Sequence, residues 1–414
     1  MSLVEAAPVA PAIETRVAVS ISPQPRPAYS LAIGYLRAFV TLLVLAHHAV
    51  LAYVPFGAVV PATLVARPRL WQAFPVLDSG KWGGFGLFTS FNDVYFMALM
   101  FFISGLFVSS SIGRKGAGGF LRGRMLRLGL PFLVAAAVIA PVAYYPAYLQ
   151  TGGRGLTGYW QQWRALGSWP AGPAWFVWVL LAFDCVAAGL LLVAPRWTCR
   201  AAERLTSLAA RPALFFAFLA AVSAAVYLPM AFLFDPFRWT EFGPFFFQTS
   251  RIFHYLAYFL FGVALGASGV SRGLFAPDGK LARRWVWWVN LAPFLLAVLI
   301  VVFLVAISTP NHPVRWGLIG GAAFAMACAA SCLACISVFV RFARRPRPVF
   351  DSLRDNAYGM YLLHYVFANW MQFALLGAHL PALAKGIVAI IGTVLFSWGA
   401  TAALRRIPAV ARVI

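Results

Sequence analysis

Residues 35–50 read YLRAFVTLLVLAHHAV, an apolar segment with Arg37 near its start and His47 and His48 near its end. The rest of the chain decides its environment. Of 414 residues, 62% are apolar and 11% are charged, with a mean hydropathy of +0.81. Too few polar side chains remain to cover a soluble globule of this length. The segment is therefore predicted to be a membrane helix, in which ionisable groups are expensive and usually functional.

Ten apolar segments are long enough to cross a bilayer core. They begin near residues 33, 91, 128, 173, 212, 250, 286, 316, 357 and 383. The sequence thus predicts an all-α polytopic membrane protein, a bundle of about ten transmembrane helices in residues 30–404. Residues 1–29, rich in Ala, Pro and Val, are predicted to be a disordered tail, and residues 405–414 a short basic tail.

Lys and Arg alternate between the loops in a way that fixes the topology. Of the 33, nine lie on one side and Arg37 lies inside the first segment. The other 23 lie in both tails and in loops 113–127, 195–211, 271–285 and 341–356. By the positive-inside rule both termini face the cytoplasm. The excess of positive charge therefore indicates a lipid bilayer as partner and no nucleic acid, and arginine-rich composition favours a bacterial inner membrane.

Helical geometry relates the polar groups of the first segment. Arg37 and His48 are eleven residues apart, which places them about 20° apart on the helix and about 16 Å along it. His47 points about 80° away from the face that begins at Arg37. With Arg37 at the cytoplasmic edge and His48 near mid-membrane, His48 suits a general base and Arg37 suits binding of a phosphate or carboxylate. The alternative is structural: Arg37 snorkels and the histidines bridge helices.

Several motifs in order resemble membrane acyltransferase family 3. The first is Arg37-x10-His48. The others are FNDVYFMALMFFISGLF (91–107), FLRGRMLRLGLP (120–131), GPAWFVWVLLAFD (172–184) and NAYGMYLLHYVF (356–367). The resemblance covers nearly all of residues 30–404, and the 91–107 motif leans toward the branch of the glucan biosynthesis protein C type, which resembles glucan succinyltransferases.

The resemblance implies an enzyme that moves an acyl group, acetyl or succinyl first, from cytoplasmic acyl-CoA to a hydroxyl of an extracytoplasmic glycan or related envelope acceptor. Acyl-CoA is a substrate here, and no bound cofactor or metal is expected. His48 would act as base or would itself accept the acyl group. Arg37 would anchor a phosphate or carbonyl of CoA.

Other polar residues are assigned weaker roles. Arg122, Arg124 and Arg127 suit the phosphates of CoA, or serve topology alone. Asp184, an acid deep in an apolar segment, is expected either to orient His48 or to pair with an arginine. It stands where many relatives have Glu.

The remaining candidates are expected to meet the acceptor or line its cavity. Asn92 and Asp93 lie at the outer edge of the second segment, where helix capping is the alternative. Trp175, Tyr361 and His364 complete the set. His254 is expected to be interfacial. The triplet Cys328, Cys332 and Cys335 is expected to pack at helix contacts rather than bind metal.

A different class of function is a transporter or exporter of a glycan precursor or small anion, with His48, Asp184 and Arg37 as a relay. An inactive subunit of an envelope assembly is a third. Vesicle uptake and use of acyl-CoA separate these alternatives.

Overall fold

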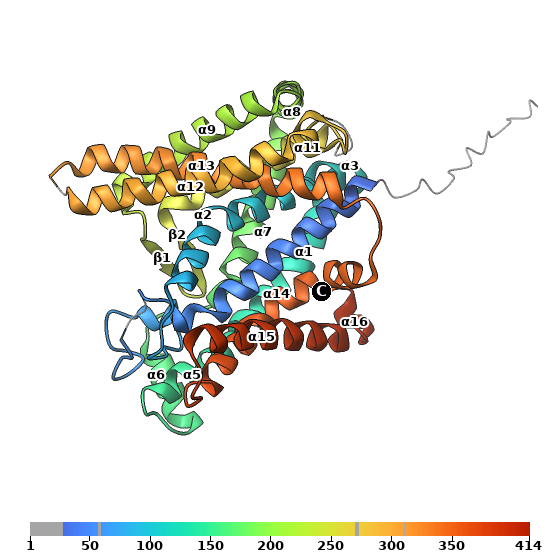
Figure 1. Ribbon diagram of the computed structural model, residues 1–414. Helices are drawn as coiled ribbons and strands as arrows, with labels where there is room; N and C mark the ends of the chain where they lie inside the picture. The colour runs from blue at the N-terminus through green and yellow to red at the C-terminus, as the bar shows by residue number, and fades with distance from the viewer. Residues whose placement is uncertain (1–27, 57–58, 270–272, 310) are drawn as a thin grey trace, which may run out of the picture.

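The computed structural model describes residues 28–56, 59–269, 273–309 and 311–414, and the chain is almost entirely helical (Figure 1). Nine helical segments among the described residues are long and apolar enough to span a membrane. The predicted all-α polytopic fold is therefore confirmed. The longer helices are α1 (Ala28–Ala49), α2 (Gly83–Gly105), α3 (Val108–Arg124), α5 (Ala140–Gln150), α6 (Leu156–Ala165), α7 (Trp175–Val193), α8 (Pro195–Ala209), α9 (Pro212–Phe234), α10 (Ile252–Ala267), α12 (Trp285–Ser308), α13 (Pro313–Phe342), α14 (Pro348–Ala374) and α15 (Ala382–Leu404). The short ones are α4 (Leu130–Val134), α11 (Lys280–Arg283) and α16 (Pro408–Ala411).

Helix α14 corresponds to the ninth predicted segment, which was expected to begin near residue 357. Its 27 residues would extend about 40 Å, long enough to cross a bilayer. It is absent from the nine apolar segments because polar residues interrupt it. Four of these are buried in the bundle: Asn356, His364, Asn369 and Gln372. Helix α14 packs against α1, α5 and α15, so these side chains face protein rather than lipid.

The third segment is longer than predicted. It runs without a loop from Val108 to Gln150, through two π-helical turns, η3 (Met125–Gly129) and η4 (Ala135–Ile139). The expectation of a basic loop over residues 113–127 is therefore wrong. Those residues are polar because they lie at the membrane surface, where water and headgroups hydrate them and a helix remains stable. The positive φ of Gly116 (68°) marks a kink within α3.

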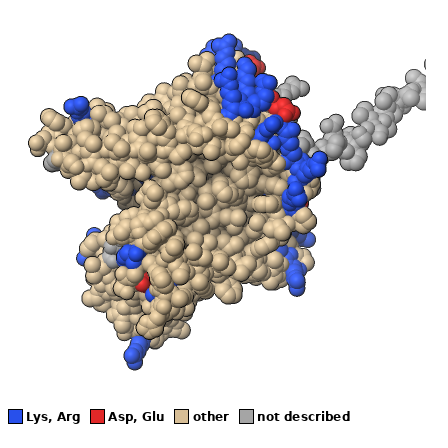
Figure 2. Space-filling model, in the orientation of Figure 1, with Lys and Arg blue, Asp and Glu red and all other residues tan. Residues whose placement is uncertain are grey.

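Charge separates the two ends of the bundle. Lys and Arg side chains gather at the end that holds α8, α11 and α16, and few occupy the opposite end (Figure 2). The start of α1 and the C-terminus also lie toward the basic end (Figure 1). The positive-inside rule assigns this end to the cytoplasm. Of the predicted N-terminal tail, residues 1–27 lie outside the described residues, and α1 already begins at Ala28.

A β-hairpin that was not predicted covers part of the outer end. Strand β1 (Trp239–Phe242) pairs antiparallel with β2 (Phe245–Gln248). The strands are only four residues long, too short to show a clear period-two pattern in the sequence. They lie between α9 and α10 in the chain and face the cavity described below.

Helices α1 and α14 run parallel in constant register, and this positions the central histidines. At the cytoplasmic end, the Tyr35 hydroxyl donates to Asp351 Oδ1 at 3.0 Å. At the outer end, His48 Nδ1 lies 3.2 Å from His364 Nε2. Both pairs are 316 residues apart in sequence, so the two helices do not slip relative to each other over this length.

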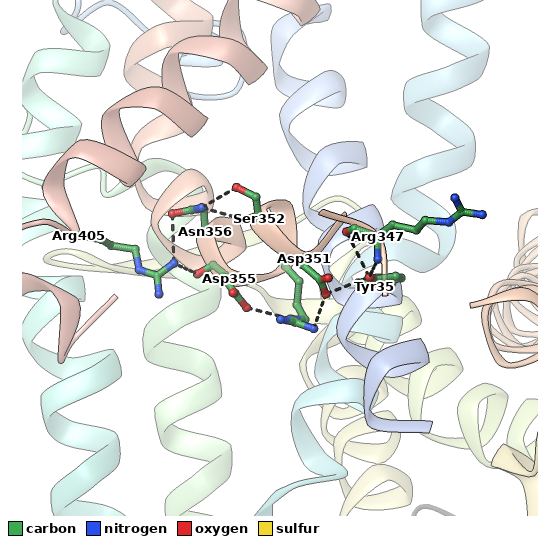
Figure 3. Close-up of polar contacts among 8 residues, drawn as sticks. Tyr35, Arg347, Asp351, Ser352, Asp355, Asn356 and Arg405 are labelled. Carbon is green, nitrogen blue, oxygen red and sulfur yellow. Dashed lines mark hydrogen bonds and ion pairs between the residues drawn. The ribbon is translucent and has the colours of Figure 1, made fainter. Parts of the chain in front are cut away.

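The cytoplasmic contacts that set this register are shown in Figure 3. The Tyr35 hydroxyl accepts from the Arg347 backbone N–H at 2.9 Å. On the other face of α14, Arg405 Nη1 donates to the Asp355 carbonyl at 2.5 Å and to Asn356 Oδ1 at 3.2 Å. The start of α14 is thereby tied both to α1 and to the end of α15. Residue 405, predicted as the start of a tail, is part of this network.

Candidate active site

A cavity of about 560 Å³ lies at the outer end of the bundle. Its walls come from the end of α1, the loop before α2, the hairpin and helices α2, α5, α7, α10 and α14. Aromatic rings predominate, with a few polar groups among them, as is usual for small-molecule sites. The polar and aromatic lining includes His47, His48, Arg69, Gln72, Asp93, Phe96, Tyr144, Trp175, Trp239, Glu241, Gln248, Tyr255, Tyr361 and Tyr365.

The hydrogen bonds around His48 assign the protons of two histidines. His364 Nδ1 lies 2.5 Å from the carbonyl oxygen of Tyr361, and His48 Nδ1 lies 2.9 Å from that of Val44. A carbonyl oxygen only accepts, so both Nδ1 atoms donate. In the neutral ring, His364 Nε2 is then an acceptor, placed 3.2 Å from the His48 Nδ1–H. This arrangement leaves Nε2 of His48 with a free lone pair, as a general base requires.

Helix α1 is placed differently from the prediction. Its apolar span covers Leu31–Ala49, so Arg37 lies within the span and His48 one residue from its outer end. The expectation that His48 lies near mid-membrane is therefore wrong. The cause is the early start of the helix at Ala28.

His47 also lines the cavity, although the helical wheel directs it away from His48. The cavity is wide enough to contact both sides of the last turn of α1. The His47 ring stacks on Phe96 with centroids 5.2 Å apart, and its buried Nδ1 has no hydrogen-bond partner among the described residues. It lacks the fixed proton arrangement of His48.

The predicted acceptor residues divide into lining and supporting positions. Trp175, Tyr361 and Asp93 line the cavity, and the Tyr361 hydroxyl donates to the Pro173 carbonyl. His364 is fully buried behind His48. Asn92 is buried and is not among the lining residues.

The capping alternative for Asn92 and Asp93 is wrong. Helix α2 begins at Gly83, so both residues lie well inside it. Asp93 instead forms an ion pair with Arg251 of α10 at 2.7 Å. The two helices approach closely because Gly105 and Gly262 sit at their contact, where an added Cβ would collide with the partner backbone.

On the cytoplasmic side, Asp184 pairs with an arginine, which is one of the two alternatives that the sequence left open. Arg124 Nε lies 3.1 Å from Asp184 Oδ2, and the carboxylate is fully buried. The partner of His48 is His364, so the orienting role expected of Asp184 is not what the structure has.

The other candidate arginines on this side are available to bind an anionic ligand. Arg37, Arg122 and Arg127 are exposed, and no carboxylate of the described residues lies within 4.0 Å of them. The Arg127 carbonyl accepts from the hydroxyl of Tyr358 on α14 at 2.6 Å, which anchors η3 to α14. These three cations suit an anionic ligand better than Arg124 does.

A second histidine centre lies outside the cavity. His254 of α10 is fully buried, contrary to the expected interfacial position. Its Nδ1 lies 2.8 Å from Ser223 Oγ, and its Nε2 lies 3.6 Å from Cys328 Sγ. The centre joins α9, α10 and α13, which the sequence spacing did not indicate because the three residues lie in separate segments.

Sequence reasoning also missed several lining residues. Arg69 and Gln72 lie in the outer loop, and Trp239 and Glu241 lie in the hairpin. No periodic pattern identifies such positions. The sequence could have identified Tyr365, because it follows His364 in a segment that was already selected. Its ring lies edge-on to His48 with centroids 5.4 Å apart.

The chain was compared with known proteins and protein families. The family model described as an acyltransferase domain matches residues 30–402. No curated protein and no solved structure matches the chain. The match spans the bundle that contains both the cavity and the cytoplasmic arginines. The chain is therefore an integral membrane member of acyltransferase family 3.

Proposed function

We propose that this acyltransferase moves an acyl group from acyl-CoA to a hydroxyl of an extracytoplasmic acceptor, with His48 as general base. The observation that supports this most strongly is the arrangement of His48 in the cavity. Its Nδ1 proton is directed at Val44 and His364, and this leaves the Nε2 lone pair free. We further propose a bacterial inner membrane as its location, consistent with the basic cytoplasmic end.

In the proposed step, His48 Nε2 takes the proton of the acceptor hydroxyl. The oxygen attacks the thioester carbonyl, a new C–O bond forms and the C–S bond breaks. The proton on His48 then passes to the departing CoA sulfur. While His48 is positively charged, its Nδ1–H is held by the Val44 carbonyl and by His364 Nε2, so His364 acts as a positioning residue.

The donor is proposed to enter from the basic end. Arg37 and His48 lie about 16 Å apart along α1, a span that an extended pantetheine arm would bridge. Arg37, which lies within the apolar span of α1, would bind a phosphate or carbonyl of CoA. Arg122 and Arg127 are exposed cations available for the remaining phosphates.

The acceptor is proposed to be a glycan. Trp175 and Trp239 lie edge-on to each other at 5.5 Å and offer apolar faces to sugar C–H groups. The carboxylates of Asp93 and Glu241 line the same cavity and are suited to accept hydrogen bonds from sugar hydroxyls. A glucan acceptor, as in the branch that the 91–107 motif resembles, fits these walls.

Inverted membrane vesicles test the proposal. Vesicles with the wild-type chain are supplied with labelled acetyl-CoA or succinyl-CoA and an envelope glycan extract, and the label is followed into glycan. Transfer to glycan with release of free CoA is the expected result, and the labelled product identifies the acyl group and the acceptor. Uptake of glycan precursor with no acyl-CoA consumed would contradict the proposal and favour a transporter.

A further inference from the structure

One wall of the cavity contains hydrogen-bond donors without protein acceptors. Arg69 and Gln72 lie in the outer loop between α1 and α2, and both line the cavity. Among the described residues, no carboxylate is within 4.0 Å of Arg69. Arg69 Nε and Gln72 Nε2 are both buried and have no hydrogen-bond partner there. A buried donor left unsatisfied costs about 1–3 kcal/mol, and more when charged, so a ligand acceptor is expected.

Several contacts fix the backbone that carries these donors. Trp71, between them in sequence, is only 2% exposed and donates from Nε1 to the Leu64 carbonyl at 2.9 Å. The hydroxyl of Tyr144 donates to the Gln72 carbonyl at 2.8 Å. Further along the loop, Asp78 forms a buried ion pair with Lys385 of α15 at 2.7 Å. A preorganised site of this kind loses little entropy when it binds.

The wall also lies close to the proposed base. The Tyr365 ring is edge-on to His48, and its hydroxyl lies 3.4 Å from the Gln72 carbonyl oxygen. One tyrosine side chain therefore separates His48 from the wall. A substrate whose reacting atoms lie at His48 could therefore place a neighbouring substituent at this wall, which Arg69 also lines.

The two acids that line the cavity do not pair with Arg69, so its guanidinium is available to a ligand. Asp93 is neutralised by Arg251 at 2.7 Å. Glu241, the other acid of the cavity lining, forms no ion pair with Arg69. A guanidinium beside an amide N–H suits a planar or tetrahedral oxyanion, to which both donate.

We propose that Arg69 and Gln72 bind a carboxylate group of the substrate. The group would come either from the far end of a dicarboxylic acyl chain or from an acidic substituent of the acceptor. The identity of the substrate rests on the function proposed above, whereas binding of an anion at this wall does not.

Thermal unfolding of the purified full-length chain tests binding without catalysis. Two matched probe pairs differ in one anionic group: glucuronate with glucose, and succinyl-CoA with acetyl-CoA. The charged member of at least one pair should stabilise the wild type more than its neutral partner does. Arg69→Gln should remove that difference. Arg67→Gln, two residues away, exposed and outside the cavity lining, should retain it. Equal stabilisation by both members of each pair, or a difference that survives Arg69→Gln, would overturn the proposal.

Kinetics then identify the source of the anion. Arg69→Gln should raise KM about 10- to 100-fold for the charged substrate and leave the neutral one unchanged. An effect on succinyl-CoA alone assigns the site to the acyl chain, and an effect on a uronate-containing acceptor alone assigns it to the acceptor. Equal KM values in variant and wild type for all four substrates would contradict the proposal while leaving acyl transfer established. If the wild type transfers no acyl group, the proposed function fails, and the unfolding experiment still decides the anion site.

Discussion

The two histidine centres differ in access rather than in residue type. Each of the two histidines has one ring nitrogen within 3 Å of an oxygen, that of Val44 for His48 and that of Ser223 for His254. Each also has a second partner on another helix, His364 for His48 and Cys328 for His254. His48 lines the cavity of about 560 Å³, whereas His254 is 0% exposed. A base must reach its substrate, so only the first centre is suited to catalysis.

The partners of the two centres also differ. His364 presents a lone pair to His48 and supports a positive charge there. His254 is enclosed by Ser223 and Cys328, which link α9 and α13 across α10. The same side chain is therefore proposed to act as a base in one centre, whereas in the other it joins helices. The following predictions separate these roles.

The largest effect is expected for His48→Ala. Loss of a general base reduces turnover about 10²- to 10⁴-fold. The rate of label transfer from acyl-CoA into glycan, measured per folded molecule in vesicles, checks this. Turnover within a factor of two or so of the wild type would exclude His48 as the base.

A smaller reduction is expected for His364→Ala. The variant keeps His48 but loses the acceptor at its Nδ1–H, so kcat should fall about 10-fold, the size expected for one hydrogen bond to a charged group, with KM unchanged. His364→Gln offers an amide oxygen in a similar position and should recover part of the loss. Equal kcat values for the Ala and Gln variants, or a change in KM alone, would argue against a positioning role.

His47→Ala tests the neighbouring position on α1. His47 lines the cavity but has no hydrogen-bond partner at Nδ1 within the described chain, so its removal should lower kcat less than 10-fold. Steady-state kinetics beside His48→Ala provide the comparison. A loss as large as that of His48→Ala would contradict the assignment of the base to His48 alone.

His254→Ala should leave turnover per folded molecule unchanged and lower stability. It removes two buried contacts and opens a cavity, which together cost about 2–4 kcal/mol. Thermal unfolding in detergent measures the loss, with the exposed Arg67→Gln as a control that should not change. An unchanged unfolding midpoint would contradict the structural role of this centre.

The sequence predicted the parts of this account that depend on single helices. Hydropathy predicted ten spans, of which nine are long and apolar enough among the residues that the structure describes and the remaining one is α14. The spacing of Arg37 and His48 predicted their relative orientation on the first helix. The contacts between helices could not be predicted. His364 is 316 residues from His48, and Ser223 and Cys328 come from separate segments, so no local pattern relates them.

Other errors have a local cause. Basic residues made the second half of α3 resemble a loop. Their polarity reflects an interfacial position of the helix rather than the absence of one. The outer wall with Arg69 and Gln72 has no secondary-structure periodicity to reveal it.

The measurement that tests the central claim most directly compares His48→Ala with His254→Ala in one vesicle assay at equal amounts of folded protein. Transfer from labelled acyl-CoA should be nearly abolished in the first variant and close to wild type in the second. Equal losses in both, or a greater loss in His254→Ala, would contradict the assignment of catalysis to the cavity.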